Sequence, residues 1–166
     1  MIKGLHHSAF RCRDSEETRA FYEDFLGLPL VNSLHIEQTK TGRGTDVMHT
    51  FYRMADGSCL AFFEVPGVSF DFKPQHDFDL HIALEVEADE LRRVQDKAAA
   101  AGLENRGLAD HDFIESLYLR DPNGYVVEVT AKRPGHEQAM DPRLNKARDV
   151  LDAWQRRKLR GKTAAV

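Results

Sequence analysis

The sequence predicts an α+β fold in which a strand–helix–strands unit occurs twice and is followed by a C-terminal helix. Two apolar, alternating stretches, 5–14 and 80–87, each carry a histidine near their start. Each is followed by a segment with helical spacing, 15–27 and 88–102, with acidic residues in its first turn and a glycine at its end. The order strand, helix, strands is therefore written twice along the chain.

The clearest strand signal is a β-hairpin over 116–130. Its turn is Asp-Pro-Asn-Gly at 121–124, in which proline restricts one dihedral angle and Asn-Gly tolerates positive φ. The segments on both sides alternate and are rich in Val, Leu and Tyr. Aligning 55–63 with 122–130 superimposes Gly57 on Gly124, so the internal repeat extends to this hairpin.

These patterns suggest one domain over residues 1–133, with modules at about 1–66 and 77–133, and a helical extension over 134–166. In the extension we expect a helix that begins near Asp141 as N-cap, because Pro142 suits the first helical position. Apolar residues recur at helical spacing and predict a narrow stripe that needs a partner. The stripe consists of Leu144, Ala147, Leu151 and Trp154.

A carboxylate in the second strand of the hairpin requires an explanation. Glu128 sits among valines, where a buried charge is costly unless it is paired or bound to a metal. His7 and His81 open equivalent strands of the two repeats, and the position equivalent to Glu128 is Ala61. Two imidazoles and one carboxylate form a ligand set typical of non-haem Fe(II), and Mn(II) also fits. The alternative is a glutamate paired with an arginine, and two structural histidines.

The chain resembles the vicinal oxygen chelate superfamily, which includes glyoxalase I, fosfomycin-resistance transferases, bleomycin-binding proteins and type I extradiol dioxygenases. The resemblance covers about residues 1–132 and includes a Phe-Tyr…Leu-Gly-Leu segment at 21–28. It implies paired βαβββ modules that form a curled, barrel-like sheet around a metal, which residues matching His7, His81 and Glu128 would hold. It also implies a homodimer, in some members with each metal site completed by both chains.

Within the superfamily, one pattern resembles the extradiol dioxygenase signature. His111, Leu117-Tyr118, the 121–124 turn and Glu128 follow its order and spacing, although Ala109 departs from it. The resemblance implies that His111 and Tyr118 hydrogen-bond the substrate as catalytic residues. The alternative is that Tyr118 is a packed strand aromatic.

Two departures from the sequence patterns of the superfamily bear on which reaction the protein catalyses. Ser58 stands where ring-cleaving dioxygenases usually have an acid–base histidine, and a hydroxyl cannot carry a proton near neutral pH as imidazole does. His49 or His76 are possible substitutes, but the sequence does not bring either to the metal. Ala61 stands where glyoxalase I usually has a second carboxylate, which argues against that activity. The potassium-binding loop of the fosfomycin transferases is not recognisable.

Arginines on the face of the proposed metal ligands indicate that the substrate carries a negative charge. Alternation puts Arg11 and Arg13 on the face of His7, and Arg120 is a candidate from the hairpin. We expect Arg11 and Arg120 to bind a carboxylate or catecholate, and Arg13 to pair with Glu85 or Glu87.

Composition excludes several classes of function. The net charge of −4 gives no support for nucleic-acid binding. We find no apolar run of roughly 20 residues, as a membrane span needs, and expect no signal peptide. Cys12 and Cys59 lack metal or redox spacing, so Cys12 is expected to be a buried free thiol, which suits a cytoplasmic location.

The sequence therefore predicts a metal-dependent enzyme, most readily an extradiol-type dioxygenase (an oxidoreductase) acting on a small aromatic diol or a related oxygen-chelating substrate. Fe(II) is the favoured metal, with Mn, Zn, Ni or Co as alternatives. Other candidate functions are a metal-dependent isomerase, lyase or thiol transferase of the glyoxalase or fosfomycin-resistance type, and a bleomycin-resistance-like binding protein. We expect a homodimer with the C-terminal helix as an interface element.

Overall fold

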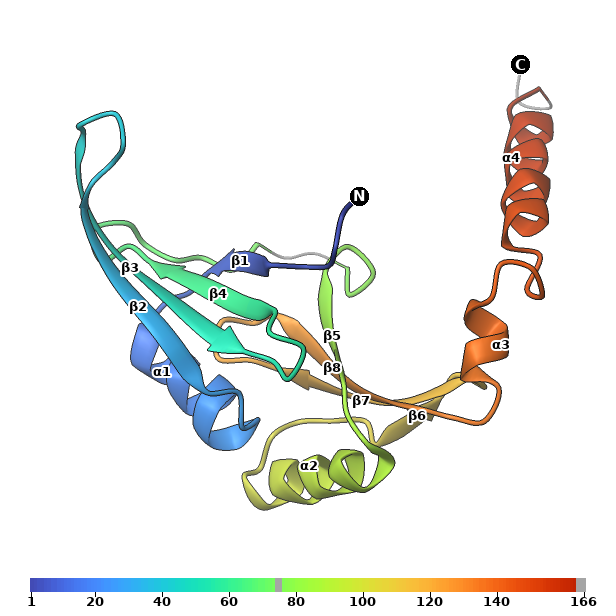
Figure 1. Ribbon diagram of the computed structural model, residues 1–166, viewed down its shortest axis with the longest axis horizontal. Helices are drawn as coiled ribbons and strands as arrows, with labels where there is room; N and C mark the ends of the chain where they lie inside the picture. Colours follow the sequence, from blue (N-terminus) through green and yellow to red (C-terminus); the bar gives the residue numbers. More distant parts are fainter. Residues whose placement is uncertain (74–75, 164–166) are drawn as a thin grey trace.

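The computed structural model describes residues 1–73 and 76–163, with side chains up to residue 158. It contains two four-stranded sheets with the same strand order (Figure 1). The first sheet has the order β1-β4-β3-β2, with β1 at His7–Arg11, β2 at Leu30–Gln38, β3 at Gly44–Arg53 and β4 at Cys59–Glu64. The second has the order β5-β8-β7-β6, with β5 at His81–Glu85, β6 at Leu108–Asp110, β7 at Ile114–Arg120 and β8 at Val126–Lys132.

The helices follow the predicted order. They are α1 at Ser15–Arg19, which continues as the π-helix η1 at Ala20–Phe25, then α2 at Ala88–Ala100, α3 at His136–Met140 and α4 at Ala147–Thr163. Asp14 caps α1, because its side chain accepts hydrogen bonds from the backbone N–H groups of Glu16 and Glu17. The π-helical turn carries Phe21 and Tyr22 into the core, and the sequence contains no signal for it.

Strand register confirms the internal repeat. In each module the first strand pairs in parallel with the last strand, β1 with β4 and β5 with β8. Ala9 lies opposite Ala61 in the first sheet, and Ala83 lies opposite Glu128 in the second. Ala61 and Glu128 are therefore equivalent positions, as the sequence alignment predicts. The prediction of an α+β fold with paired βαβββ modules is confirmed.

One face of each sheet packs on a helix, and the other face does not. Figure 1 shows α1 and α2 on the same side of the molecule, each against its own sheet. The helix-covered faces form the core, which includes Leu60, Phe62, Leu91, Val127 and Val129. The histidine and glutamate positions lie on the opposite, uncovered faces, because side chains alternate along each strand.

The 121–124 turn joins the two modules rather than simply closing a hairpin. The buried Asp121 accepts a hydrogen bond from the Tyr22 hydroxyl at 3.1 Å. Asn123 accepts from the backbone N–H of Arg13 at 2.8 Å and donates to the Thr18 hydroxyl at 3.3 Å. Burial raises the pKa of the Asp121 carboxyl, and burial beside Asp121 raises the pKa of Tyr22 well above its usual value.

Two predictions about local structure are wrong. Asp141 does not begin the long helix, because 141–146 form turns in which the backbone N–H groups of Leu144 and Asn145 donate to the Asp141 carbonyl. The helix α4 begins at Ala147, whose N–H donates to the Asn145 side chain. Arg13 does not pair with Glu85 or Glu87. Arg13 forms an ion pair with Glu17, one helical turn away, and Glu85 pairs with Lys132 at 3.1 Å.

The predicted buried thiol is confirmed. Cys12 is 1% exposed, and burial raises the pKa of its thiol to about 11, while Cys59 is half-buried. Both cysteines are free. Across the described helices, none is both long and apolar enough to cross a bilayer.

The connection between the modules has a testable energetic consequence. Asp121→Ala leaves the buried Tyr22 hydroxyl without an acceptor and removes one of the two acceptors of the Asn123 side-chain amide, so we expect a loss on the order of 3 kcal/mol in the free energy of unfolding. The control is Asp56→Ala in the equivalent turn of the first module. Asp56 is exposed, and among the described residues its side chain accepts hydrogen bonds from the backbone N–H and hydroxyl of Ser58, so a much smaller loss is expected. Urea unfolding measures the stability of both variants. Equal losses would contradict the role of the 121–124 turn in joining the two modules.

Candidate metal centre

Glu128 is a buried carboxylate at the centre of the second sheet. It is 5% exposed, and its Oε1 accepts hydrogen bonds from the Ser116 hydroxyl at 2.5 Å and from the Tyr118 hydroxyl at 3.0 Å. Both donors lie on β7, which pairs with β8 so that Tyr118 stands opposite Glu128. These two bonds fix the orientation of the carboxylate and leave Oε2 free of them.

The free oxygen faces His81. The distance from His81 Nε2 to Glu128 Oε2 is 3.3 Å, and the His81 side chain is 42% exposed. The parallel pairing of β5 with β8 causes this approach, because it puts His81 opposite Val126, two residues before Glu128 and on the same face of the sheet. An imidazole nitrogen and a carboxylate oxygen that converge on the uncovered face of a sheet are suitable ligands for a divalent transition metal.

A second histidine lies behind this pair. His111 Nε2 is 3.0 Å from the Tyr118 hydroxyl oxygen. Because the single hydroxyl proton of Tyr118 is donated to Glu128, the proton between Tyr118 and His111 belongs to His111 Nε2. Burial and the negative charge of Glu128 raise the pKa of Tyr118, so the phenol stays protonated at neutral pH. The structure brings together four predicted site residues, His81, His111, Tyr118 and Glu128.

His7 does not join this group within one chain. Its ring contacts His6 and lies 5.6 Å from the ring of Phe51 and 6.5 Å from that of His49, between centroids. Over the described part of the chain, no three His, Cys, Asp or Glu side chains come close enough together to hold a metal ion. A single chain therefore offers two of the three predicted ligands at one place and the third at another.

The face around His7 includes a residue that the sequence did not assign to the site. His49, on β3, is buried and stacks on Phe63 with centroids 3.7 Å apart and ring planes 9° apart. Its Nδ1 lies 3.0 Å from the Phe62 carbonyl oxygen, so Nδ1 carries the proton and Nε2 is the basic nitrogen. The alternation of His49 and Phe51 along β3 is visible in the sequence. Whether they lie on the face of His7 depends on the register of β3 with β4, which the sequence does not show.

Arg120 and Ser58 are engaged in contacts within the protein, whereas Arg11 makes one long hydrogen bond. Arg120 forms an ion pair with Asp77 at 2.7 Å and donates to the Gly124 carbonyl. Arg11 shares the uncovered face with His7, and its guanidinium lies 3.5 Å from the Val68 carbonyl. Ser58 is buried, and its hydroxyl donates to Asp56 at 2.6 Å within the turn.

The comparison with protein families identifies the fold family. Residues 4–129 match the model of the glyoxalase/bleomycin resistance protein/dioxygenase superfamily. The chain belongs to this superfamily. The resemblance to the vicinal oxygen chelate superfamily is thereby confirmed. No curated protein matches the chain at a significant level.

Solved structures of this superfamily have the same fold at low sequence identity. A glyoxalase/bleomycin resistance protein/dioxygenase domain from Frankia sp. EAN1pec is 21% identical, with a TM-score of 0.64 over 80% of this chain and all of that one. A variant of the fosfomycin resistance protein FosX from Listeria monocytogenes, complexed with Mn(II) and 1S,2S-dihydroxypropylphosphonic acid, is 22% identical, with a TM-score of 0.61 over 82% of this chain and 98% of that one. FosX from Mesorhizobium loti is 19% identical, with a TM-score of 0.60 over 84% and 99%.

The hydrogen bonds to Glu128 predict a measurable effect without any ligand. Ser116→Ala removes one of two donors to a buried charged group, so we expect the free energy of unfolding to fall by about 2 kcal/mol at neutral pH. Thr130→Val is the matched control. The Thr130 hydroxyl lies 3.0 Å from the Ser116 hydroxyl and donates to the Glu115 carbonyl but makes no hydrogen bond to the carboxylate, so a smaller loss is expected. Denaturant unfolding at pH 7 compares the two, and a larger loss for Thr130→Val contradicts the assignment.

Proposed function

We propose that this chain is a metal-dependent enzyme whose metal centre is shared between two copies of the chain. His81 and Glu128 of one copy and His7 of the other are the proposed ligands. The observation that carries the proposal is the pair formed by His81 and Glu128, with 3.3 Å between nitrogen and oxygen and the carboxylate held by Ser116 and Tyr118. The third ligand is supplied by a second copy, because His7 of the same chain faces His49 and Phe51 instead.

The ligand chemistry supports a divalent transition metal. Two imidazole nitrogens and one carboxylate leave positions open for substrate oxygens, and they suit Fe(II) or Mn(II). When bound, such an ion supplies a Lewis acid that holds and polarises two adjacent oxygen atoms of the substrate. Ser116 and Tyr118 keep the ligand carboxylate oriented, which is the role of hydrogen-bonding groups behind metal ligands in general.

The surroundings of His7 favour a small aromatic substrate. Phe51, Phe63 and the ring of His49 lie on the same face of the first sheet as His7, and they offer flat apolar surfaces. Arg11 lies on this face as well and is our candidate for binding a substrate anion. The Nε2 of His49 is a basic nitrogen on this face, which Ser58 cannot supply. We therefore propose extradiol-type dioxygenation of a small aromatic diol as the first candidate reaction.

The second candidate is a metal-assisted reaction of the fosfomycin-resistance type. It is favoured by the likeness to FosX, which binds Mn(II) and a dihydroxypropylphosphonic acid in one solved structure. The serine at the position of the usual dioxygenase histidine favours it too. Both candidates use a metal that binds adjacent substrate oxygens, and they differ in the need for molecular oxygen.

The shared centre predicts a specific result for mixed dimers. In a dimer of one His7→Ala chain and one Glu128→Ala chain, one site carries both lesions and the other site is intact. We expect about one metal ion per mixed dimer, half of the wild-type content, and little metal in either homodimer. Co-expression of two differently tagged chains, tandem purification and elemental analysis make the measurement. If the wild-type dimer binds its full complement of metal but the mixed dimer binds none, the metal centre is not shared between the two chains.

The reaction is tested with protein that is purified without oxygen. For the first candidate we expect about one iron per chain and oxygen uptake with catechols, both lost in Glu128→Ala. Manganese or zinc in place of iron, with consumption of fosfomycin and no oxygen uptake, overturns the dioxygenase and supports the second candidate. Wild-type protein that holds no metal after loading with iron or manganese overturns both.

A further inference from the structure

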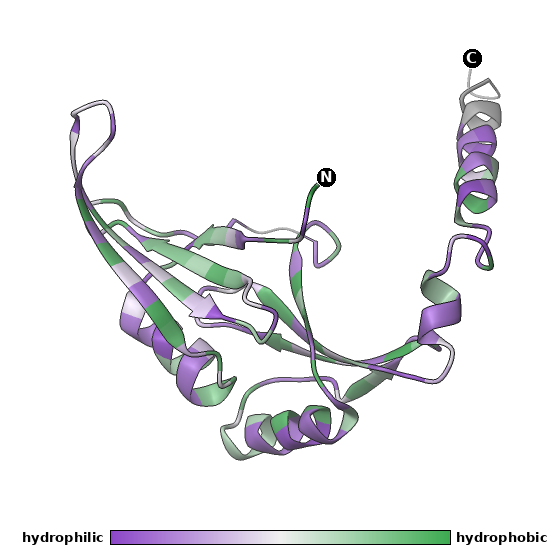
Figure 2. Ribbon diagram, viewed as in Figure 1, coloured by the Kyte–Doolittle hydropathy of each residue, from purple (hydrophilic) through white to green (hydrophobic). Residues whose placement is uncertain are grey.

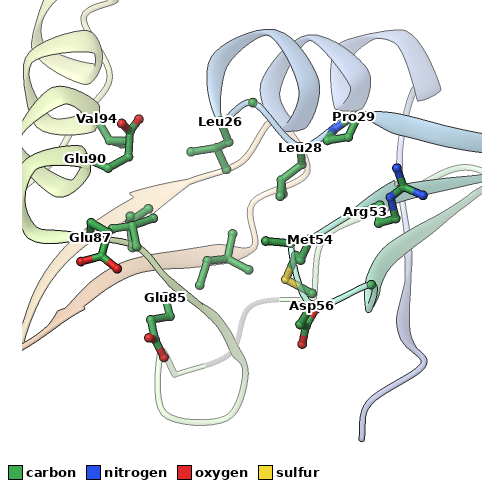
Figure 3. Close-up of a pocket in the computed structure, with 16 residues that line it drawn as sticks. Leu26, Leu28, Pro29, Arg53, Met54, Asp56, Glu85, Glu87, Glu90 and Val94 are labelled. Carbon is green, nitrogen blue, oxygen red and sulfur yellow. The ribbon is translucent and has the colours of Figure 1, made fainter.

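The equivalent turns of the two modules, at 54–57 and 121–124, make different contacts with the other module, and one of them borders a large cleft. The 121–124 turn is seated on β1 and α1 through buried hydrogen bonds. The equivalent turn at 54–57 faces β5 and the start of α2 across a cavity of about 1050 Å³ (Figure 3). This cleft lies away from His81 and Glu128, neither of which lines it.

The cleft has an apolar floor and an acidic rim. Leu28, Met54, Leu84 and Val94 supply apolar surface. Four carboxylates, Asp56, Glu85, Glu87 and Glu90, and one cation, Arg53, line the same cleft. Figure 3 shows side chains from the end of η1, from the turn and from α2 facing one another across it. Glu85 pairs with Lys132 and Glu90 with Arg93, so the uncompensated charge lies mainly at Asp56 and Glu87.

The C-terminal helix has the complementary character. Val150, Leu151 and Trp154 lie on α4 at helical spacing and are 65%, 48% and 48% exposed. The same helix carries four basic residues and two acidic ones over residues 147–158, namely Arg148, Arg156, Arg157 and Lys158 against Asp149 and Asp152. Figure 2 shows hydrophobic residues along α4, although the helix stands apart from both sheets. Such a face on a helix without a neighbour indicates a docking surface.

The position of α4 favours a second copy as the partner. In Figure 1, α3 leads the chain away from the sheets, and α4 stands apart from both η1 and α2, which border the cleft. The helix also lies beyond residues 4–129, which match the superfamily. The structures from Frankia and Listeria are covered almost completely by about four-fifths of this chain. The family match therefore does not include α4.

We propose that α4 of one copy docks its apolar face into the acidic cleft of a second copy. Leu151 and Trp154 fill the apolar floor, and the basic residues at 156–158 lie against Asp56 and Glu87. Apolar burial supplies the affinity, and opposite charge fixes the direction of the helix in the cleft. This contact is independent of the metal ligands, so it adds to the shared centre and does not rest on it.

Trp154 is the one tryptophan of the chain, so its fluorescence reports on α4 alone. As protein concentration rises, we expect its emission to shift to shorter wavelength and its quenching by acrylamide to fall, and both changes to reverse on dilution. The double variant Asp56→Lys, Glu87→Lys is expected to lose both changes. Glu37→Lys, an exposed charge reversal on β2 away from the cleft, is expected to keep them.

A charge-exchange experiment identifies the two surfaces directly. The tail variant Arg156→Glu, Arg157→Glu is expected to lose the shift by itself. Mixing it with a copy that carries Asp56→Lys, Glu87→Lys and Trp154→Phe is expected to restore the shift, because the acidic tail then meets a basic cleft. A shift that is insensitive to dilution, or that survives the cleft reversal, overturns the proposal. Metal content is measured in every variant, and equal loading shows that the ligand site is unaffected.

Discussion

The parallel pairing of the first and last strands of each module is the constraint on which the rest of the structure depends. It puts β1 beside β4 and β5 beside β8, although long stretches of chain separate them. A parallel pair needs a crossover connection, and α1 and α2 supply it, so both helices cover the same side of the molecule. The opposite faces stay free of helices, and the chemistry-bearing side chains lie there.

The same pairing gives the two modules different roles. In the second module it brings His81 to Glu128, whereas in the first it sets His7 beside an apolar strand in which Ala61 replaces the carboxylate. Glu128 can remain buried because Ser116 and Tyr118 donate to one oxygen and His81 faces the other. One module therefore carries a supported pair of candidate ligands, and the other carries a histidine among aromatic rings.

The contacts between the two modules differ because the two copies of the repeat carry different residues in their equivalent turns. Asp121 and Asn123 bind Tyr22, Thr18 and the backbone of Arg13, so this half of the joint is closed and its polar groups are satisfied. The equivalent turn of the first module has Met54 and Asp56 at these positions and no such bonds, and an acidic, apolar cleft remains. The C-terminal helix, which follows the residues that match the superfamily, has the charge and the apolar face to occupy it.

The sequence by itself determined the order of elements and the repeat, and it singled out the candidate site residues. Hydrophobic alternation, helix termini and matching glycines depend on neighbouring residues, so they are readable along the chain, and Glu128 is conspicuous because a charge in an apolar strand is costly. Only the tertiary structure decided which of these groups meet. It separated His7 from His81, brought His49 to the face of His7, and used Asp121 and Asn123 to join the modules. Such contacts depend on strand register and on the packing of segments more than a hundred residues apart, which local patterns do not encode.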